Sequence, residues 1–175
     1  MSLPKLIEMS RVDFVTIDTI GPPGQRTFYL QAAQDDLLMT LIVEKEQAAA
    51  IAVAISSLLE QLGREAQGPS TVGLGLIEPV DPLFRVGKLE LGYDQARDLL
   101  VIVAEELETE QGQESTTVHI WADQSQMEQL ASRAAIAVAS GRPTCALCGE
   151  VVSPDEAHVC VRDNGHKRLY EIDGD

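Results

Sequence analysis

The stretch Leu37–Gly63, LLMTLIVEKEQAAAIAVAISSLLEQLG, contains the change of hydrophobic period that decides the fold. Its first seven residues are nearly all apolar, which predicts a central strand that is covered on both faces. From Glu44 onward the apolar residues recur at helical spacing, and Gly63 is a natural helix terminator. The alanines of this helix allow it to lie close against a sheet. Its apolar stripe consists of Ala48, Ile51, Ile55, Leu58 or Leu59, and Leu62.

Two further strands precede this stretch. Residues Val12–Ile20 are rich in valine, isoleucine, threonine and phenylalanine, and residues Arg26–Ala33 alternate between apolar and polar side chains. The segment Gly21–Gly24 between them contains two adjacent prolines, which cannot pair in a ladder and therefore predict a turn. Connections this short make three consecutive strands antiparallel.

The second half of the chain repeats this order of elements. A helix is expected from Ser125 to about Ser140, with Gly141 ending it, and Ser125 and Glu128 have the spacing of a capping box. The apolar stripe of this helix consists of Met127, Leu130, Ala134 and Val138. The three strands expected before it are Phe84–Tyr93, Leu99–Ala104 and Thr116–Trp121.

The order β-β-β-α, linker, β-β-β-α predicts an α+β fold with an internal duplication. The halves, residues 11–63 and 84–140, are joined by a linker at 64–83, and the sequence AIAVA occurs at 50–54 and again at 135–139. We expect the halves to form antiparallel sheet with both helices packed on it. Residues 1–140 would form this body, and residues 141–175 a separate tail.

The tail holds all three cysteines of the protein. Cys145, Cys148, His158 and Cys160 supply four soft or borderline ligands within one short segment, and four such ligands suit a tetrahedral zinc ion. His166 is a competing fourth ligand. Four protein ligands leave no open position for water, so the predicted zinc is structural rather than catalytic. The folding of this tail would then depend on the ion.

The charge of the chain limits its partners. The formal net charge is −15, which disfavours contact between the body and phosphate backbones or anionic membranes. The tail is the least acidic part, so any nucleic-acid contact is expected there, near Arg142, Arg162, Lys167 and Arg168. No apolar run in the first ten residues has the length of a secretory signal. An odd number of cysteines in a CxxC setting favours a reducing compartment, so we expect a cytoplasmic protein.

Two classes of function fit these patterns, and the sequence leaves open whether the protein is an enzyme. The first is a non-enzymatic interaction module that carries the zinc tail and binds a protein partner. The second is an enzyme that acts on a small phosphorylated or nucleotide-like substrate, with Arg26, Arg85 and Lys88 as an anion-binding site. We favour the first class, because no nucleophile or general base can be named.

Three runs resemble an uncharacterised bacterial family, domain of unknown function 3090, over nearly the whole chain. They are Gly24–Gln31, Glu78–Gly87 and the tail pattern Cys145-x-x-Cys148-Gly149…His158-x-Cys160-x-x-x-Asn164-Gly165. The resemblance implies a compact bacterial cytoplasmic protein with a cysteine-bearing tail. It implies no catalytic residues.

Overall fold

A computed structural model of the chain describes residues 5–22, 24–64, 75–108, 114–140, 145, 147, 148 and 159. The chain divides into two units, Met1–Ala139 and Ser140–Asp175. The first unit has the predicted α+β composition. Its described elements are β1 (Leu6–Met9), β2 (Phe14–Ile20), β3 (Thr27–Gln34), β4 (Leu37–Val43), α1 (Lys45–Gln61), β5 (Pro82–Asp94), β6 (Leu99–Glu106), β7 (Thr117–Ala122) and α2 (Gln124–Ala139).

All seven described strands belong to one sheet with the order β1-β7-β6-β5-β4-β3-β2. Within each predicted run of three strands the pairing is antiparallel, as expected. The prediction of an antiparallel sheet is nevertheless wrong, because β4 pairs with β5 in parallel and β1 pairs with β7 in parallel. The connection from β4 through α1 crosses over the sheet and returns the chain in the same direction, which produces a parallel neighbour. Strand β1 lies outside both predicted halves.

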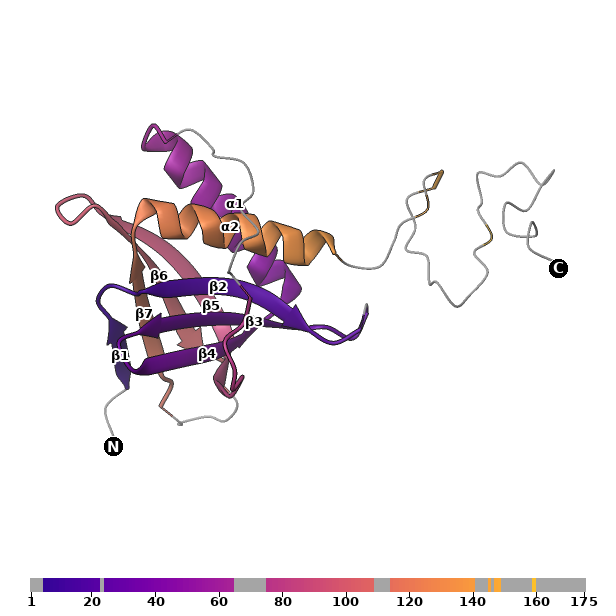
Figure 1. The fold of residues 1–175 in the computed structure, drawn as a ribbon, viewed down its shortest axis with the longest axis horizontal. Helices are drawn as coiled ribbons and strands as arrows, with labels where there is room; N and C mark the ends of the chain where they lie inside the picture. Colours follow the sequence, from indigo (N-terminus) through magenta and orange to yellow (C-terminus); the bar gives the residue numbers. More distant parts are fainter. Residues whose placement is uncertain are drawn as a thin grey trace. The chain divides into compact units, whose positions relative to one another are not determined.

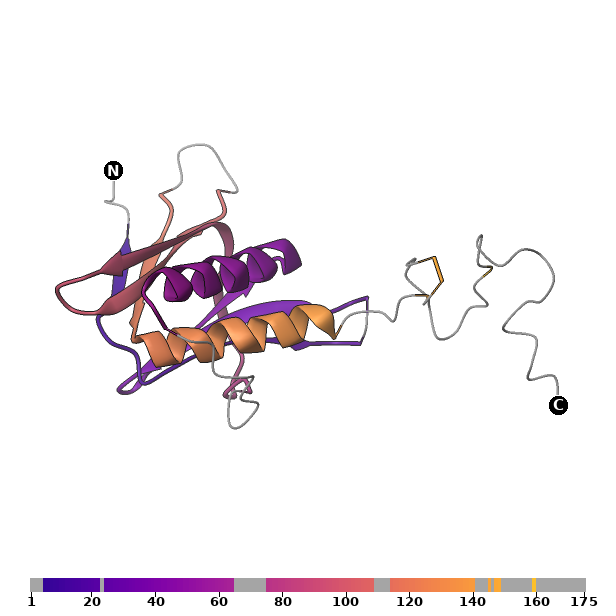
Figure 2. The ribbon, with the colours of Figure 1, turned by 90° about the horizontal axis from the view of Figure 1, so that it is seen from above.

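Both helices cover the same face of this curved sheet. Figure 1 shows β2, β3 and β4 running across the direction of β5, β6 and β7, and Figure 2 shows α1 and α2 lying over them. Most of the two predicted stripes is buried and joins the inward side chains of the strands in one core cluster. Val138 is only half-buried against this cluster, and Leu62 is a half-buried residue just beyond the end of α1 and outside the cluster. Burying these aliphatic side chains is the main stabilising contribution to the body.

The first turn of α2 differs from the prediction. The helix begins at Gln124, and the carboxylate of Asp123 accepts a hydrogen bond from the backbone N–H of Gln126 at 2.8 Å. The side chain of Gln126 accepts one in return from the backbone N–H of Asp123 at 3.0 Å. The capping box expected at Ser125 and Glu128 is therefore placed two residues too late. Aspartate and serine cap helices about equally well, so residue type alone does not discriminate between the two starts.

The second half repeats the strand pairing of the first half in the same register. The first part of β5 pairs in parallel with β4, as β1 pairs in parallel with β7. The rest of β5 pairs antiparallel with β6, as β2 pairs antiparallel with β3. The single strand β5 thus corresponds to β1 and β2 together. Within each strand, the residue number of a position in the first half and that of its counterpart in the second half differ by a constant. The matching pairs are Glu8–His119 with Pro82–Thr40, Val15–Ala32 with Leu89–Ala104, Ala32–Met39 with Ala104–Val118, and Phe28–Val43 with Leu100–Ala122.

The helix caps extend this correspondence. Glu44 and Gln47 of α1 match Asp123 and Gln126 of α2, and in both pairs the glutamine accepts a hydrogen bond from the backbone N–H of the acidic residue. In the same alignment, Ala54 of α1 corresponds to Arg133 of α2. The AIAVA match at 50–54 and 135–139 therefore does not fall on equivalent helix positions.

Candidate binding groove between α1 and β5

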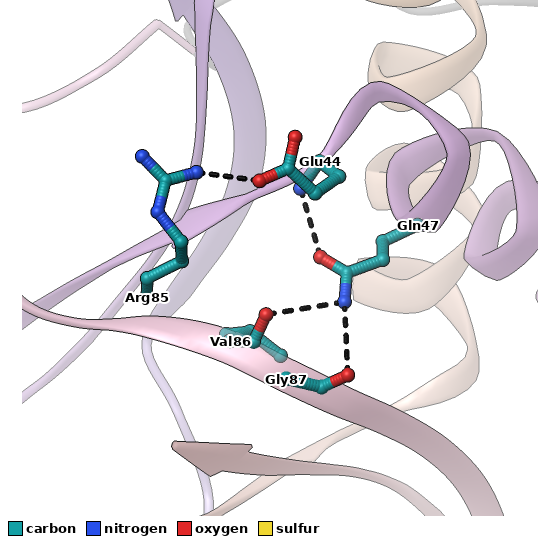
Figure 3. Close-up of polar contacts among 5 residues, drawn as sticks. All are labelled: Glu44, Gln47, Arg85, Val86 and Gly87. Carbon is teal, nitrogen blue, oxygen red and sulfur yellow. Dashed lines mark hydrogen bonds and ion pairs between the residues drawn. The ribbon is translucent and has the colours of Figure 1, made fainter. Parts of the chain in front are cut away.

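Gln47 fixes the first turn of α1 to β5. Its Oε1 accepts a hydrogen bond from the backbone N–H of Glu44 at 2.8 Å, and its Nε2 donates to the carbonyls of Val86 and Gly87 at 3.2 and 3.4 Å (Figure 3). The Glu44 carboxylate lies 2.5 Å from Nη1 of Arg85 on the same strand. These contacts hold the first turn of α1 against the β-bulge of β5.

Beyond this junction a groove of about 340 Å³ lies between α1 and β5. Most of its lining is apolar, and Lys88 is the one lining residue with a formal charge. Gly87 contributes only backbone to the lining. A Cβ atom there would lie 2.9 Å from the Cα atom of Leu107, so a larger residue would require a shift of that backbone. The lining residues are Gln47, Ala50, Ile51, Ala54, Gly87, Lys88, Leu89 and Leu91.

The equivalent place between α2 and β2 is bridged by an ion pair. Nη2 of Arg133 lies 2.5 Å from Oδ2 of Asp18, and both side chains are only 21% exposed. Arg133 corresponds to Ala54 in the alignment of the helix caps, and Asp18 corresponds to Gly92 in the strand register. Alanine and glycine have no side chain that can reach across, so nothing from these two positions bridges α1 and β5. Ala54 lines the groove at the helix position that Arg133 occupies in α2, whereas Gly92 is not among the lining residues.

Lys88 contributes to the lining of the groove, but its ammonium group is in solvent on the face of β5 that carries Glu90, whereas Leu89 and Leu91 face the core. Its Nζ is 3.0 Å from Oε1 of Glu90, and the Lys88 and Glu90 side chains are 57% and 52% exposed. The hydrogen bond to Glu90 raises the pKa of Lys88, and the charges of Glu90 and Glu105 raise it further. The side chain is consequently cationic at neutral pH.

The three cations predicted to bind an anion have different surroundings. Arg85 and Lys88 already have carboxylate partners, Glu44 and Glu90. Arg26 is half-buried just before β3 and is not among the residues that line the groove. Of the predicted set, Lys88 alone lines the groove.

The predicted zinc ligands fall mainly outside the described residues. Cys145 and Cys148 are described and half-buried, whereas His158, Cys160 and the alternate ligand His166 are not described. Among the described residues, no group of three or more histidine, cysteine, aspartate or glutamate side chains gathers as a metal site. The zinc site therefore stays a prediction from the spacing of its residues.

Sequence reasoning missed Gln47 and Ala54, the residues that shape the groove. The pattern Glu44-x-x-Gln47 is an acidic variant of the capping box and was available as a signal. Nothing local marks Ala54, because its role depends on how α1 lies on β5, which no short segment of sequence defines.

Over the described residues the fold is α+β, with a mixed seven-stranded sheet, two helices on one face and a mostly apolar groove beside α1. None of the described helices has the length and apolar character needed to cross a bilayer. Residues 7–160 match the family model described as Protein of unknown function (DUF3090), and the chain belongs to this family. Searches of curated proteins and of solved structures found no match.

Proposed function

We propose that the protein is a non-catalytic binding module whose body takes a small ligand in the groove between α1 and β5. The groove itself carries this proposal, because a mostly apolar concavity of about 340 Å³ with few polar groups is the usual form of a small-molecule site. The alternative, an enzyme that acts on a phosphorylated substrate, has less support. Its anion site would use Arg85 and Lys88, which lie 2.5 and 3.0 Å from the carboxylates of Glu44 and Glu90.

An internal duplication is part of the proposal. It is supported by the matching strand registers and by the two equivalent acid–glutamine caps. Two copies that are identical at first can diverge, so that one keeps an ion pair between its helix and its strand and the other opens a binding site. The ion pair of Arg133 and Asp18 represents the bridged copy, and Ala54, which lines the groove, represents the open copy.

The tail enters the proposal as a structural zinc element that presents a surface to a partner in the cytoplasm. Its support is the spacing of Cys145, Cys148, His158 and Cys160, which suits one tetrahedral ion. The zinc would order the tail and take no part in ligand binding by the body.

The groove is tested by filling it in the full chain. The neutral fluorophore N-phenyl-1-naphthylamine serves as the probe, since its emission rises on entering an apolar site. We expect saturable binding by the unmodified protein, and a loss of affinity of about tenfold or more in Ala54→Arg, whose side chain would occupy the groove as Arg133 occupies the equivalent place.

Val53→Arg is the matched control, because it adds the same side chain to the same helix at a position that is 67% exposed and does not line the groove. This variant should bind the fluorophore as the unmodified protein does. Equal binding by all three proteins, or no saturable binding by any of them, would refute the proposed site.

A further inference from the structure

The half of the body that contains α1 leaves apolar side chains of its strand incompletely covered. Leu89 and Leu91 of β5 line the groove and are only half-buried beside the core cluster. Their counterparts in the strand register, Val15 and Ile17 of β2, are 3% and 0% exposed. The same part of the strand is therefore fully covered beside α2 and partly open beside α1.

This difference coincides with smaller residues on α1. The alignment of the helix caps matches Ala50 and Ala54 of α1 with Gln129 and Arg133 of α2. The side chain of Arg133 reaches Asp18 of β2, and a stem of that length covers apolar surface beneath it, whereas an alanine side chain ends at its Cβ atom. The two alanines thus leave the leucines of β5 facing the groove.

The groove offers a ligand aliphatic contact and no free charge. The amide of Gln47 donates to the carbonyls of Val86 and Gly87, which occupies both of its hydrogens. The ammonium of Lys88 lies with Glu90 on the face of β5 opposite the leucines. Among the described residues that line the groove no other has a formal charge, so a charged group of a ligand would lose hydration there without gaining a partner.

We propose that the groove between α1 and β5 selects an uncharged aliphatic molecule, which covers Leu89 and Leu91 as fully as their counterparts are covered beside α2. This inference rests on the proposed function and specifies its ligand class. Apolar contact supplies the affinity, so the affinity rises with the aliphatic surface of the ligand and falls when a charge must lie between the walls. The volume, about 340 Å³, limits the ligand to a small molecule.

The ligand class can be tested by displacement of N-phenyl-1-naphthylamine from the full chain, with probes that carry two butyl chains on different centres. Dibutyl ether is neutral, dibutylammonium is cationic and dibutyl phosphate is anionic, and in each probe the centre lies between the chains. Sodium chloride at about 0.5 M screens the net charge of the protein. We expect dibutyl ether to displace the fluorophore at an about tenfold lower concentration than either ion, because a charge between apolar walls loses hydration.

Chain length and two variants test the source of the affinity. In the series diethyl, dipropyl and dibutyl ether, each added methylene should lower the displacing concentration about threefold. Lys88→Gln should leave the order of the three centres unchanged, because the ammonium it removes does not face the leucines. Ala54→Leu supplies aliphatic cover from the chain itself and should weaken fluorophore binding about fivefold or more. Val53→Leu is its matched control on the exposed side of the same helix.

The outcomes separate the two proposals. If the fluorophore binds and Ala54→Arg abolishes its binding, but a charged probe displaces it as well as dibutyl ether does, the groove stands and the inference of an uncharged ligand fails. The inference also fails if displacement does not depend on chain length. A dimer that Ala54→Arg converts to a monomer in sedimentation velocity would assign the cover to a second copy of the chain, and this result would overturn the inference as well. If the fluorophore does not bind at all, both proposals fail.

Discussion

Asp98 carries the clearest electrostatic prediction at the scale of single residues. The hydroxyl of Tyr93 and the amide of Gln124 each donate to Oδ1 of Asp98 at 2.8 Å. The hydrogen bond from Tyr93, followed by the one from Gln124, lowers the pKa of Asp98, and the same contact with Asp98 raises the pKa of Tyr93. Tyr93→Phe should therefore raise the pKa of Asp98 toward its ordinary value, as measured by carbon NMR of the carboxyl group.

The sign of the accompanying stability change follows from the two pKa directions. Because the folded state lowers the pKa of Asp98, its contribution is present above the unfolded pKa of about 4 and is lost as the pH falls through the folded value. The folded state raises the pKa of Tyr93, so its contribution is present below about 10 and is lost as the pH rises through the folded value.

Urea unfolding measures the difference in the free energy of unfolding between the unmodified protein and Tyr93→Phe. This difference should be largest at intermediate pH and should become smaller at low and at high pH. Gln124→Ala removes the weaker of the two donors and should raise the pKa of Asp98 by less. An Asp98 titration that is the same in Tyr93→Phe and in the unmodified protein would contradict this account.

At the scale of elements, Gln47 and Gln126 provide a matched test of the two halves. Each accepts a hydrogen bond from the N–H of its acidic cap, and each donates to a backbone carbonyl, that of Val86 in β5 and that of Val12 between β1 and β2 respectively. Gln47→Ala and Gln126→Ala should each lower the free energy of unfolding by about 1–2 kcal/mol, because each removes the partner of a cap N–H and of a backbone carbonyl.

Gln61→Ala is the control for these variants. Gln61 is an exposed glutamine in the last turn of α1, so its replacement should change the free energy of unfolding by less than about 0.5 kcal/mol. Chemical denaturation of the three variants measures the differences. A loss at one cap but none at the other would argue against equivalent roles, and hence against the inferred duplication.

The sequence was sufficient to predict the elements whose signals are local. The strand periods of residues 27–43 and the helical stripe from Ala48 to Leu59 depend on neighbours only a few residues away, and the structure confirms them. Strand β1 was missed because its four residues, Leu6–Met9, are too few for a recognisable period. The parallel pairings were missed because they join segments far apart in the chain.

The same reasoning explains the limits of site prediction. The Lys88–Glu90 contact links residues on one face of a single strand, and alternation alone would place them together. The Arg85–Glu44 contact and the groove depend on how α1 lies on β5, which no short segment of sequence encodes.

At the scale of the whole molecule, the tail should bind zinc without supporting the body. The core cluster of the body consists of residues no later than Ala137, whereas the predicted ligands begin at Cys145. The double variant Cys145→Ser, Cys148→Ser should therefore lose stoichiometric zinc, measured by plasma mass spectrometry. Its body should unfold within about 2 °C of the unmodified protein in calorimetry.

Single histidine variants distinguish the two candidate fourth ligands. His158→Ala should lose zinc and His166→Ala should keep it, because His158 and Cys160 project to the same side of an extended segment. Purified chain that contains no metal when prepared without chelators would overturn the zinc proposal.

The pairing of β1 with β7 also has a consequence for biosynthesis. The ribosome makes β1 first, yet the only strand that pairs with it, within the described sheet, is the last strand of the body to emerge. In a nascent chain, the backbone hydrogen-bonding groups of β1 consequently lack their partners in β7 until translation has passed Ala122. Long-range pairing of this kind slows folding and leaves apolar edges exposed in the interval. Stalled chains that end before β7 should accordingly be more sensitive to protease and recruit chaperones more strongly than chains that extend beyond α2.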